Sequence, residues 1–160
     1  MGMFDTIYNV PVKCPRCGDS GPKSVQIKSG PQNLSAYEFG KDEIEIDWTY
    51  EYYGSIIDED KRIIRGIATC EKCKEETNKK MDDLINDAKK KGEIKAPEGG
   101  GYLFQCEIDG KSALGVILKR LDEAYDGNRN IELFEVTIWL NEKNMPIAVD
   151  HIVKLNDIIE

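Results

Sequence analysis

The chain has 160 residues, a net charge of −8 and a hydrophobic fraction of 40%, values that suit one globular domain or two small ones. Its apolar runs are only a few residues long, so we expect neither a transmembrane helix nor a signal peptide. Five cysteines without a secretion signal indicate a reducing compartment. We therefore expect a cytoplasmic protein whose cysteines bind metal rather than form disulfides.

Charge is distributed unevenly along the chain. Residues 1–33 and 61–91 carry net charges of +2 and +4, whereas residues 34–60 and 92–160 carry −8 and −6. The two basic stretches are also the ones that contain paired cysteines. Their lysines can therefore either offset a negatively charged thiolate–metal centre or contact nucleic-acid phosphates.

Two Cys-x-x-Cys pairs are the most informative motif in the chain. Each pair directs two thiolates toward one point, and two pairs complete the tetrahedral sulfur shell that Zn²⁺ prefers. A filled shell of four thiolates leaves no position for water or substrate, which is typical of a structural site. The pattern predicts Zn²⁺ bound by Cys14, Cys17, Cys70 and Cys73.

The first pair, followed by Gly18, resembles the Cys-Pro-x-Cys-Gly knuckle of a zinc ribbon. Glycine there permits the positive φ that turns backbone N–H groups toward the sulfurs. The second pair matches less well, because Lys74 replaces the glycine, and this difference also disfavours rubredoxin-type iron. The resemblance implies zinc and a β-hairpin scaffold. With its short Met-Gly-Met-Phe-Asp start, the chain is also similar to small uncharacterised phage, prophage and archaeal zinc-ribbon proteins.

The segment between the two pairs is expected to form β-structure. Short strands are predicted at residues 25–27 and 62–69, the second leading into Cys70. Residues 43–53 alternate between apolar and polar side chains, which predicts a half-buried strand with one acidic, solvated face. The apolar face of that strand consists of Ile44, Ile46, Trp48, Tyr50 and Tyr52.

An amphipathic helix is predicted over residues 75–91, where apolar residues recur at i, i+3, i+4 and i+7 and Gly92 provides a stop. Residues 92–101 contain Pro97 and three consecutive glycines. This composition predicts a flexible linker and a domain boundary.

Beyond the linker, the sequence predicts a hairpin of strands 103–108 and 111–118 around an Asp109-Gly110 turn. A helix over residues 119–126 would follow. The alternative is a longer helix, because the apolar spacing from Leu114 to Tyr125 also fits helical periodicity.

Residues 131–140 and 147–155 predict two further strands. We therefore expect an α+β protein with two domains. Residues 1–92 would form a β-rich zinc ribbon with a long strand-rich insertion and one amphipathic helix. Residues 102–160 would form a small antiparallel β domain of the α+β type.

Few residues suggest catalysis. The sequence contains neither a phosphate-binding glycine loop nor a nucleophile elbow. Its one histidine, His151, alternates in phase with apolar residues, and Cys106 lies in an apolar stretch. Both are expected to be structural. We expect a protein that is not an enzyme.

Acidic residues flank the aromatic stripe around Trp48, and their field repels phosphate. We therefore predict a zinc-binding structural or adaptor-type protein that recognises another protein and does not bind membranes. The alternative is a nucleic-acid-associated zinc-ribbon protein, acting in transcription or in DNA or RNA processing and encoded by a phage. Its phosphate contacts would come from Lys13, Arg16, Lys23, Lys72, Lys74, Lys79 and Lys80.

Overall fold

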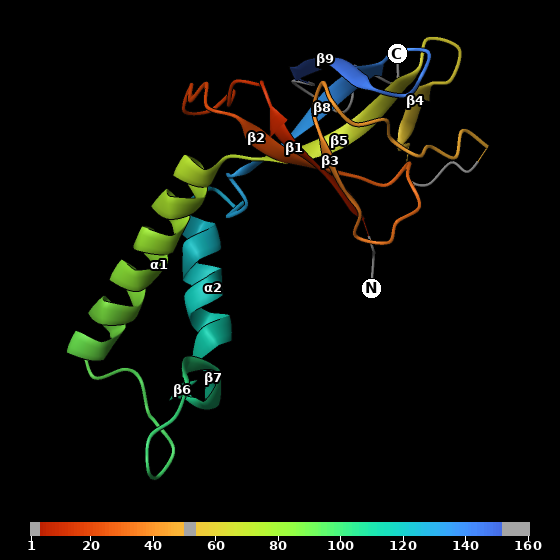
Figure 1. Ribbon diagram of the computed structural model, residues 1–160. Coiled ribbons are helices and arrows are strands. Elements are labelled where there is room, and N and C mark those ends of the chain that lie inside the picture. Colours follow the sequence, from red (N-terminus) through yellow and green to blue (C-terminus); the bar gives the residue numbers. More distant parts are fainter. Residues whose placement is uncertain (1–3, 50–53, 152–160) are drawn as a thin grey trace. The chain divides into compact units, whose positions relative to one another are not determined.

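The computed structural model describes residues 4–49 and 54–151 and shows a mixed α+β protein (Figure 1). The described residues fall into two compact units. The first unit combines residues up to 72 with residues from 132 onward, and the second comprises residues 73–131. Each unit has a hydrophobic core of its own.

A curled sheet of seven strands forms the first unit (Figure 1). The strands are β1 (Asp5–Val10), β2 (Lys23–Ile27), β3 (Ala36–Glu38), β4 (Ile56–Asp58), β5 (Ile63–Thr69), β8 (Leu133–Leu140) and β9 (Pro146–His151). Their order is β3-β1-β2-β5-β8-β9, and β4 also pairs with β5. All the pairs are antiparallel except β1 with β3.

Strand β5 is the centre of this sheet. One of its edges pairs with β8 along its whole length, from Ile63 opposite Trp139 to Thr69 opposite Leu133. β2 and β4 pair with different parts of β5, β2 with residues 66–69 and β4 with residues 63–64. The strand therefore joins N-terminal and C-terminal parts of the chain in one sheet.

The core of the first unit is built from one face of this sheet and from Ile44 of the loop between β3 and β4. Side chains alternate between core and surface along β2 and β8, as a sheet with one buried face requires. The buried members are Ile7, Val10, Val12, Val25, Ile27, Ile44, Ile64, Ala68, Val136, Ile138 and Leu140. Trp48 is partly buried and packs against this group.

A buried carboxylate fixes the loop that leads into β3. Asp5 is completely buried, and its carboxylate accepts hydrogen bonds from the backbone N–H groups of Gln32 (2.8 Å), Asn33 (3.1 Å) and Ser35 (3.0 Å). Gln32 and Leu34 have positive φ values of 56° and 65°. Such backbone conformations cost energy, and the three charge-assisted bonds offset that cost.

Two helices and a short hairpin form the second unit. Its elements are α1 (Glu71–Lys90, whose first two residues lie in the first unit), the 3₁₀ helix η1 (Leu103–Gln105), β6 (Glu107–Ile108), β7 (Lys111–Ser112) and α2 (Ala113–Ala124). The apolar stripe of α1 packs with buried Ala113 and Ile117 of α2 and with Ile108. Neither helix within the described residues is long and apolar enough to cross a membrane.

Most of the predicted strands are confirmed. β2, β5 and β8 lie where residues 25–27, 62–69 and 131–140 predicted them. β9 confirms the strand expected from residue 147 as far as His151, and the remainder lies outside the described residues. The helix predicted over residues 75–91 is present but begins earlier, at Glu71.

The strand predicted over residues 43–53 is wrong for residues 43–49, which form a loop, while residues 50–53 lie outside the described part. The alternation in burial is nevertheless present, since Ile44 is buried and Ile46 and Trp48 are partly buried. The backbone of this loop bonds to separate segments instead of one neighbouring strand. Ile44 N–H donates to Asn144, and Asp47 N–H donates to Ser29.

The strand predicted over residues 111–118 is also wrong, and the alternative helix is correct. Asp109 and Gly110 form the expected turn with φ values of 50° and 76°, but the paired strands are only two residues long. Ser112 then caps α2, because its side chain accepts a hydrogen bond from the N–H of Gly115. The burial of Ala113, Ile117 and Leu121 on one helical face outweighs the strand pattern.

The predicted division into residues 1–92 and 102–160 differs from the observed units. Residues 92–101 lie within the second unit, and the strands after residue 132 belong to the first. The physical reason is that β8 supplies the backbone hydrogen bonds for a whole edge of β5. The C-terminal strands are therefore part of the N-terminal sheet.

Gly66 of β5 pairs with Ile27 of β2. A Cβ atom at this position would overlap the Val25 side chain and lie 3.2 Å from the carbonyl oxygen of Gln26. We predict that Gly66→Ala lowers the free energy of unfolding by about 1–3 kcal/mol, the usual cost of overpacking. Chemical denaturation followed by circular dichroism measures this change.

Gly115→Ala is the matched control, because a Cβ there meets only Ser112 at an ordinary 3.8 Å within α2. Alanine is the better helix former, so this variant should gain about 0.5–1 kcal/mol. A Gly66→Ala protein as stable as wild type would contradict the packing of β5 on β2.

Candidate metal centre

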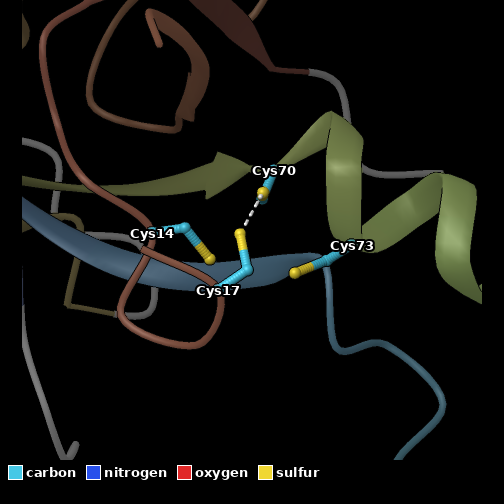
Figure 2. A group of neighbouring side chains, drawn as sticks. All are labelled: Cys14, Cys17, Cys70 and Cys73. Atoms are coloured by element: carbon cyan, nitrogen blue, oxygen red, sulfur yellow. Dashed lines mark hydrogen bonds between the residues drawn. The ribbon is translucent and has the colours of Figure 1, made fainter. Parts of the chain in front are cut away.

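Four cysteine side chains converge at one place in the structure (Figure 2). Cys14 and Cys17 come from the loop between β1 and β2, Cys70 directly follows β5, and Cys73 lies in the first turn of α1. Their sulfur atoms all lie within 4.8 Å of one another. The structure thus brings together the four residues that the sequence predicted as ligands, and the group can hold a metal ion.

The first pair lies in a tight turn closed by backbone hydrogen bonds. Cys14 N–H donates to the carbonyl oxygen of Asp19 at 2.9 Å, and Gly18 N–H donates to that of Cys14 at 3.0 Å. Gly18 has a φ of +79°, the conformation expected of a glycine after the second cysteine. This local geometry explains why the motif ends in glycine.

The second pair has a different local structure, because it lies at the start of α1. Cys70 N–H donates to the carbonyl oxygen of Glu132 at 2.7 Å, and the helix begins at Glu71. A spacing of three residues places Cys70 and Cys73 on one side of the first helical turn. A helix needs no positive φ at Lys74, which accounts for the missing glycine. The N-terminus of a helix also favours thiolates over thiols.

The thiol of Cys14 is poised to ionise. Burial raises its pKa, but hydrogen bonds from the backbone N–H groups of Cys17 and Arg16 and from the thiols of Cys17 and Cys70 outweigh burial and lower the pKa to about 7. The thiolate is the form that binds metal. The sulfurs of Cys17 and Cys70 lie 3.5 Å apart (Figure 2).

Asp19 connects the two cysteine pairs. Its carboxylate lies 3.1 Å from the ammonium of Lys23 and 3.3 Å from that of Lys72, which stands between Cys70 and Cys73. The hydrogen bond from Lys23 holds the pKa of Asp19 below its usual range; partial burial opposes this effect, and Lys72 adds to it. Asp19 therefore stays ionised and keeps the loop of the first pair next to the second.

Lys23 is itself an unusual residue, because its side chain is only 2% exposed. Its ammonium donates to the backbone carbonyl oxygens of Asp19 (3.0 Å) and Gly21 as well as to the Asp19 carboxylate. A buried ammonium is tolerated only when it is paired and hydrogen-bonded in this way. Sequence reasoning placed Lys23 among candidate phosphate contacts, and its burial overturns that assignment.

The donor set fits a soft, tetrahedral metal. Four sulfur ligands favour Zn²⁺ or iron over hard cations such as Mg²⁺ or Ca²⁺. Cys14, Cys70 and Cys73 are each at most 1% exposed, whereas Cys17 is exposed. The described residues place no carboxylate or histidine within this group.

The other residues considered for chemistry lie elsewhere. Cys106 is buried in the core of the second unit, and its thiol donates to the carbonyl oxygen of Tyr102 at 3.4 Å. His151 ends β9, and its side chain is outside the described part. The guanidinium carbon of Arg62 lies over the ring of Trp48, 5.9 Å from the ring centroid. Tyr50 and Tyr52 are outside the described residues.

Comparison with known proteins yields no match to this chain among family models, curated proteins or solved structures. The site alone therefore defines the class: a mixed α+β protein with a four-cysteine group that can bind metal.

We predict that Asp19→Ala weakens the binding of added Zn²⁺ to the four-cysteine group about 10-fold, in the range seen when groups that orient metal ligands are removed. Without the carboxylate, Lys72 loses its partner in the first loop and Lys23 is left as a buried, partly unpaired charge. Competition with a chromophoric chelator measures the affinity.

Glu93→Gln is the matched control, because it removes a carboxylate of a different ion pair, 2.9 Å from Arg120 in the second unit. It should leave zinc affinity unchanged. Equal affinities for wild type and Asp19→Ala would show that Asp19 does not orient the ligand loops.

Proposed function

We propose that this is a zinc-stabilised binding protein of the adaptor type, without catalytic activity, in which Cys14, Cys17, Cys70 and Cys73 hold one structural Zn²⁺. The convergence of four sulfurs within 4.8 Å carries this proposal. A four-thiolate shell fills the tetrahedral coordination of zinc and leaves no position for substrate. Gly18, which follows the first pair, has the positive φ that a glycine after the second cysteine of a zinc knuckle would need.

Zinc would join two segments that are distant in the sequence, at the end of the strand pair β2–β5. One pair lies between β1 and β2, and the other follows β5. Since the site does not exist in an unfolded chain, metal binding adds directly to folding free energy, on the order of 10 kcal/mol for structural zinc in small domains. Zinc-bound thiolates persist in a reducing compartment, so we place the protein in the cytoplasm.

We predict one zinc per chain, and a large loss of stability when it is removed. Elemental analysis of purified protein measures the stoichiometry. Cys70→Ser should abolish tight zinc binding and lower the unfolding free energy by several kcal/mol, because it removes a completely buried ligand.

Cys106→Ser serves as the control for removing a buried cysteine outside the group. It should retain one zinc and lose only the packing contribution of one sulfur. Zinc-free wild-type protein, or a Cys70→Ser variant that melts like wild type, would contradict the structural zinc site.

We further propose that the partner is a protein and that nucleic acid is disfavoured. Of the cations that could contact phosphate, Lys23 is buried and Lys72 is paired with Asp19. The net charge of −8 opposes approach to a polyanion. Glu43 and Glu45 are exposed beside buried Ile44, an acidic surface suited to a partner with basic side chains.

For mixed-sequence DNA or RNA at about 150 mM salt we expect a Kd above about 1 μM, which is in the range of non-specific binding. Fluorescence anisotropy with labelled oligonucleotides measures it. Lys13→Ala/Lys74→Ala removes two exposed cations while leaving the Asp19 ion pairs in place.

Micromolar or tighter binding that this double variant loses would overturn the choice of partner. The nucleic-acid-associated zinc-ribbon function would then take first place. A Glu43→Lys/Glu45→Lys variant tests the acidic surface. It should bind oligonucleotides at least as well as wild type, and it should no longer bind a protein partner that uses basic side chains to contact this surface.

A further inference from the structure

Cys17 differs from the other three cysteines of the group in its exposure to solvent. Cys14, Cys70 and Cys73 are at most 1% exposed, whereas Cys17 is exposed at the surface turn between β1 and β2. Its neighbours Pro15 and Arg16 are exposed as well. Cys17 is therefore the residue of the group that has most contact with solvent.

A second cysteine is positioned to react with a modified Cys17. The sulfur of Cys70 lies 3.5 Å from that of Cys17 (Figure 2). Cys70 is completely buried, and its backbone N–H donates a hydrogen bond to the carbonyl oxygen of Glu132, which holds it in place. The pair thus combines an exposed cysteine with a buried, fixed cysteine from a distant part of the chain.

We propose that Cys17 is a modification site, at which a hydroperoxide oxidises a zinc-bound sulfur and Cys70 then completes a disulfide that releases the metal. This inference rests on the proposed zinc site. It assigns the accessible ligand a chemical role that a purely structural site does not need.

The reaction has two balanced steps. The Cys17 thiolate attacks the outer oxygen of the hydroperoxide, the O–O bond breaks, and the leaving alkoxide takes a proton to become an alcohol, or water when the oxidant is hydrogen peroxide. The sulfur, oxidised by two electrons, is then a sulfenic acid. The Cys70 thiolate attacks that sulfur, an S–S bond forms, and the S–O bond breaks to release hydroxide, which is protonated to water.

Zinc leaves because two of its four ligands are consumed. Cys14 and Cys73 remain, and two thiolates do not satisfy the tetrahedral shell of a structural site. The new disulfide would span 53 positions of the chain and so tie the β1–β2 loop to the end of β5, as the metal did before. A Cys14–Cys17 disulfide would leave these two segments unlinked. The oxidised protein should therefore keep its sheet.

The experiment begins with the zinc content of untreated Cys106→Ser protein, a background that removes the fifth cysteine. Hydrogen peroxide is then added, zinc release is followed with a chromophoric chelator, and disulfides are mapped by mass spectrometry. The expected result is one zinc released per chain together with a peptide that links Cys17 to Cys70. Circular dichroism should show that the strand signal persists.

A second measurement requires no substitution among the four cysteines, so it does not depend on whether a variant folds. Brief treatment of the zinc-loaded protein with substoichiometric iodoacetamide should alkylate Cys17 at least about tenfold faster than Cys14, Cys70 or Cys73, because alkylation needs access to the sulfur. Equal labelling of the four ligands would overturn the inference.

The outcomes separate the two proposals. Absence of zinc from untreated protein would overturn the proposed function, and this inference with it. Zinc that is present but not released by peroxide, or a disulfide that links Cys14 to Cys17 or Cys70 to Cys73, would overturn the inference alone and leave the structural zinc site in place.

Discussion

The convergence of four cysteine sulfurs at the end of β5 is the contact that links the two halves of the cysteine motif. It joins the loop between β1 and β2 to the point where β5 ends and α1 begins. Hydrogen bonds already pair β2 with β5 along residues 66–69, so the cysteines meet at the end of an existing strand pair. The sheet therefore brings the ligands together, and a metal bound there would in turn hold the strand ends in register.

Charge around the cysteines is arranged to support this junction. Lysines in the flanking segments offset the negative charge that four thiolates and a divalent cation would carry. Asp19 gives two of them fixed positions, one buried and one at the surface. A positive segment in a sequence is thus not by itself a surface for phosphate, because its cations can be used within the fold.

The four clustered cysteines and the strands β2, β5, β8 and β9 could be predicted from the sequence, because cysteine spacing and apolar patterning are local signals, whereas β1, β3 and β4 were not predicted. Two expected strands are absent, for different reasons. Residues 43–49 alternate in burial while bonding to separate segments, and residues 113–118 are helical because Ser112 caps them. The pairing of β5 with β8 could not be predicted, because nothing in the sequence of residues 63–69 or 133–140 indicates that these two segments pair. The roles of Asp5 and Asp19 likewise depend on residues that only the fold brings close.

The hydrogen bond between Cys70 and Glu132 has a consequence for how such a chain can change during evolution. The Cys70 nitrogen and the Glu132 carbonyl oxygen lie 2.7 Å apart, although 61 residues separate them in the sequence. The chain therefore returns to the sheet next to the point where it left. The intervening segment, with its own core of α1, α2 and the β6–β7 hairpin, is therefore an insertion whose two ends are adjacent. Its length and content can vary between related chains without moving β8 away from β5. Its first turn carries Cys73, one of the four clustered cysteines.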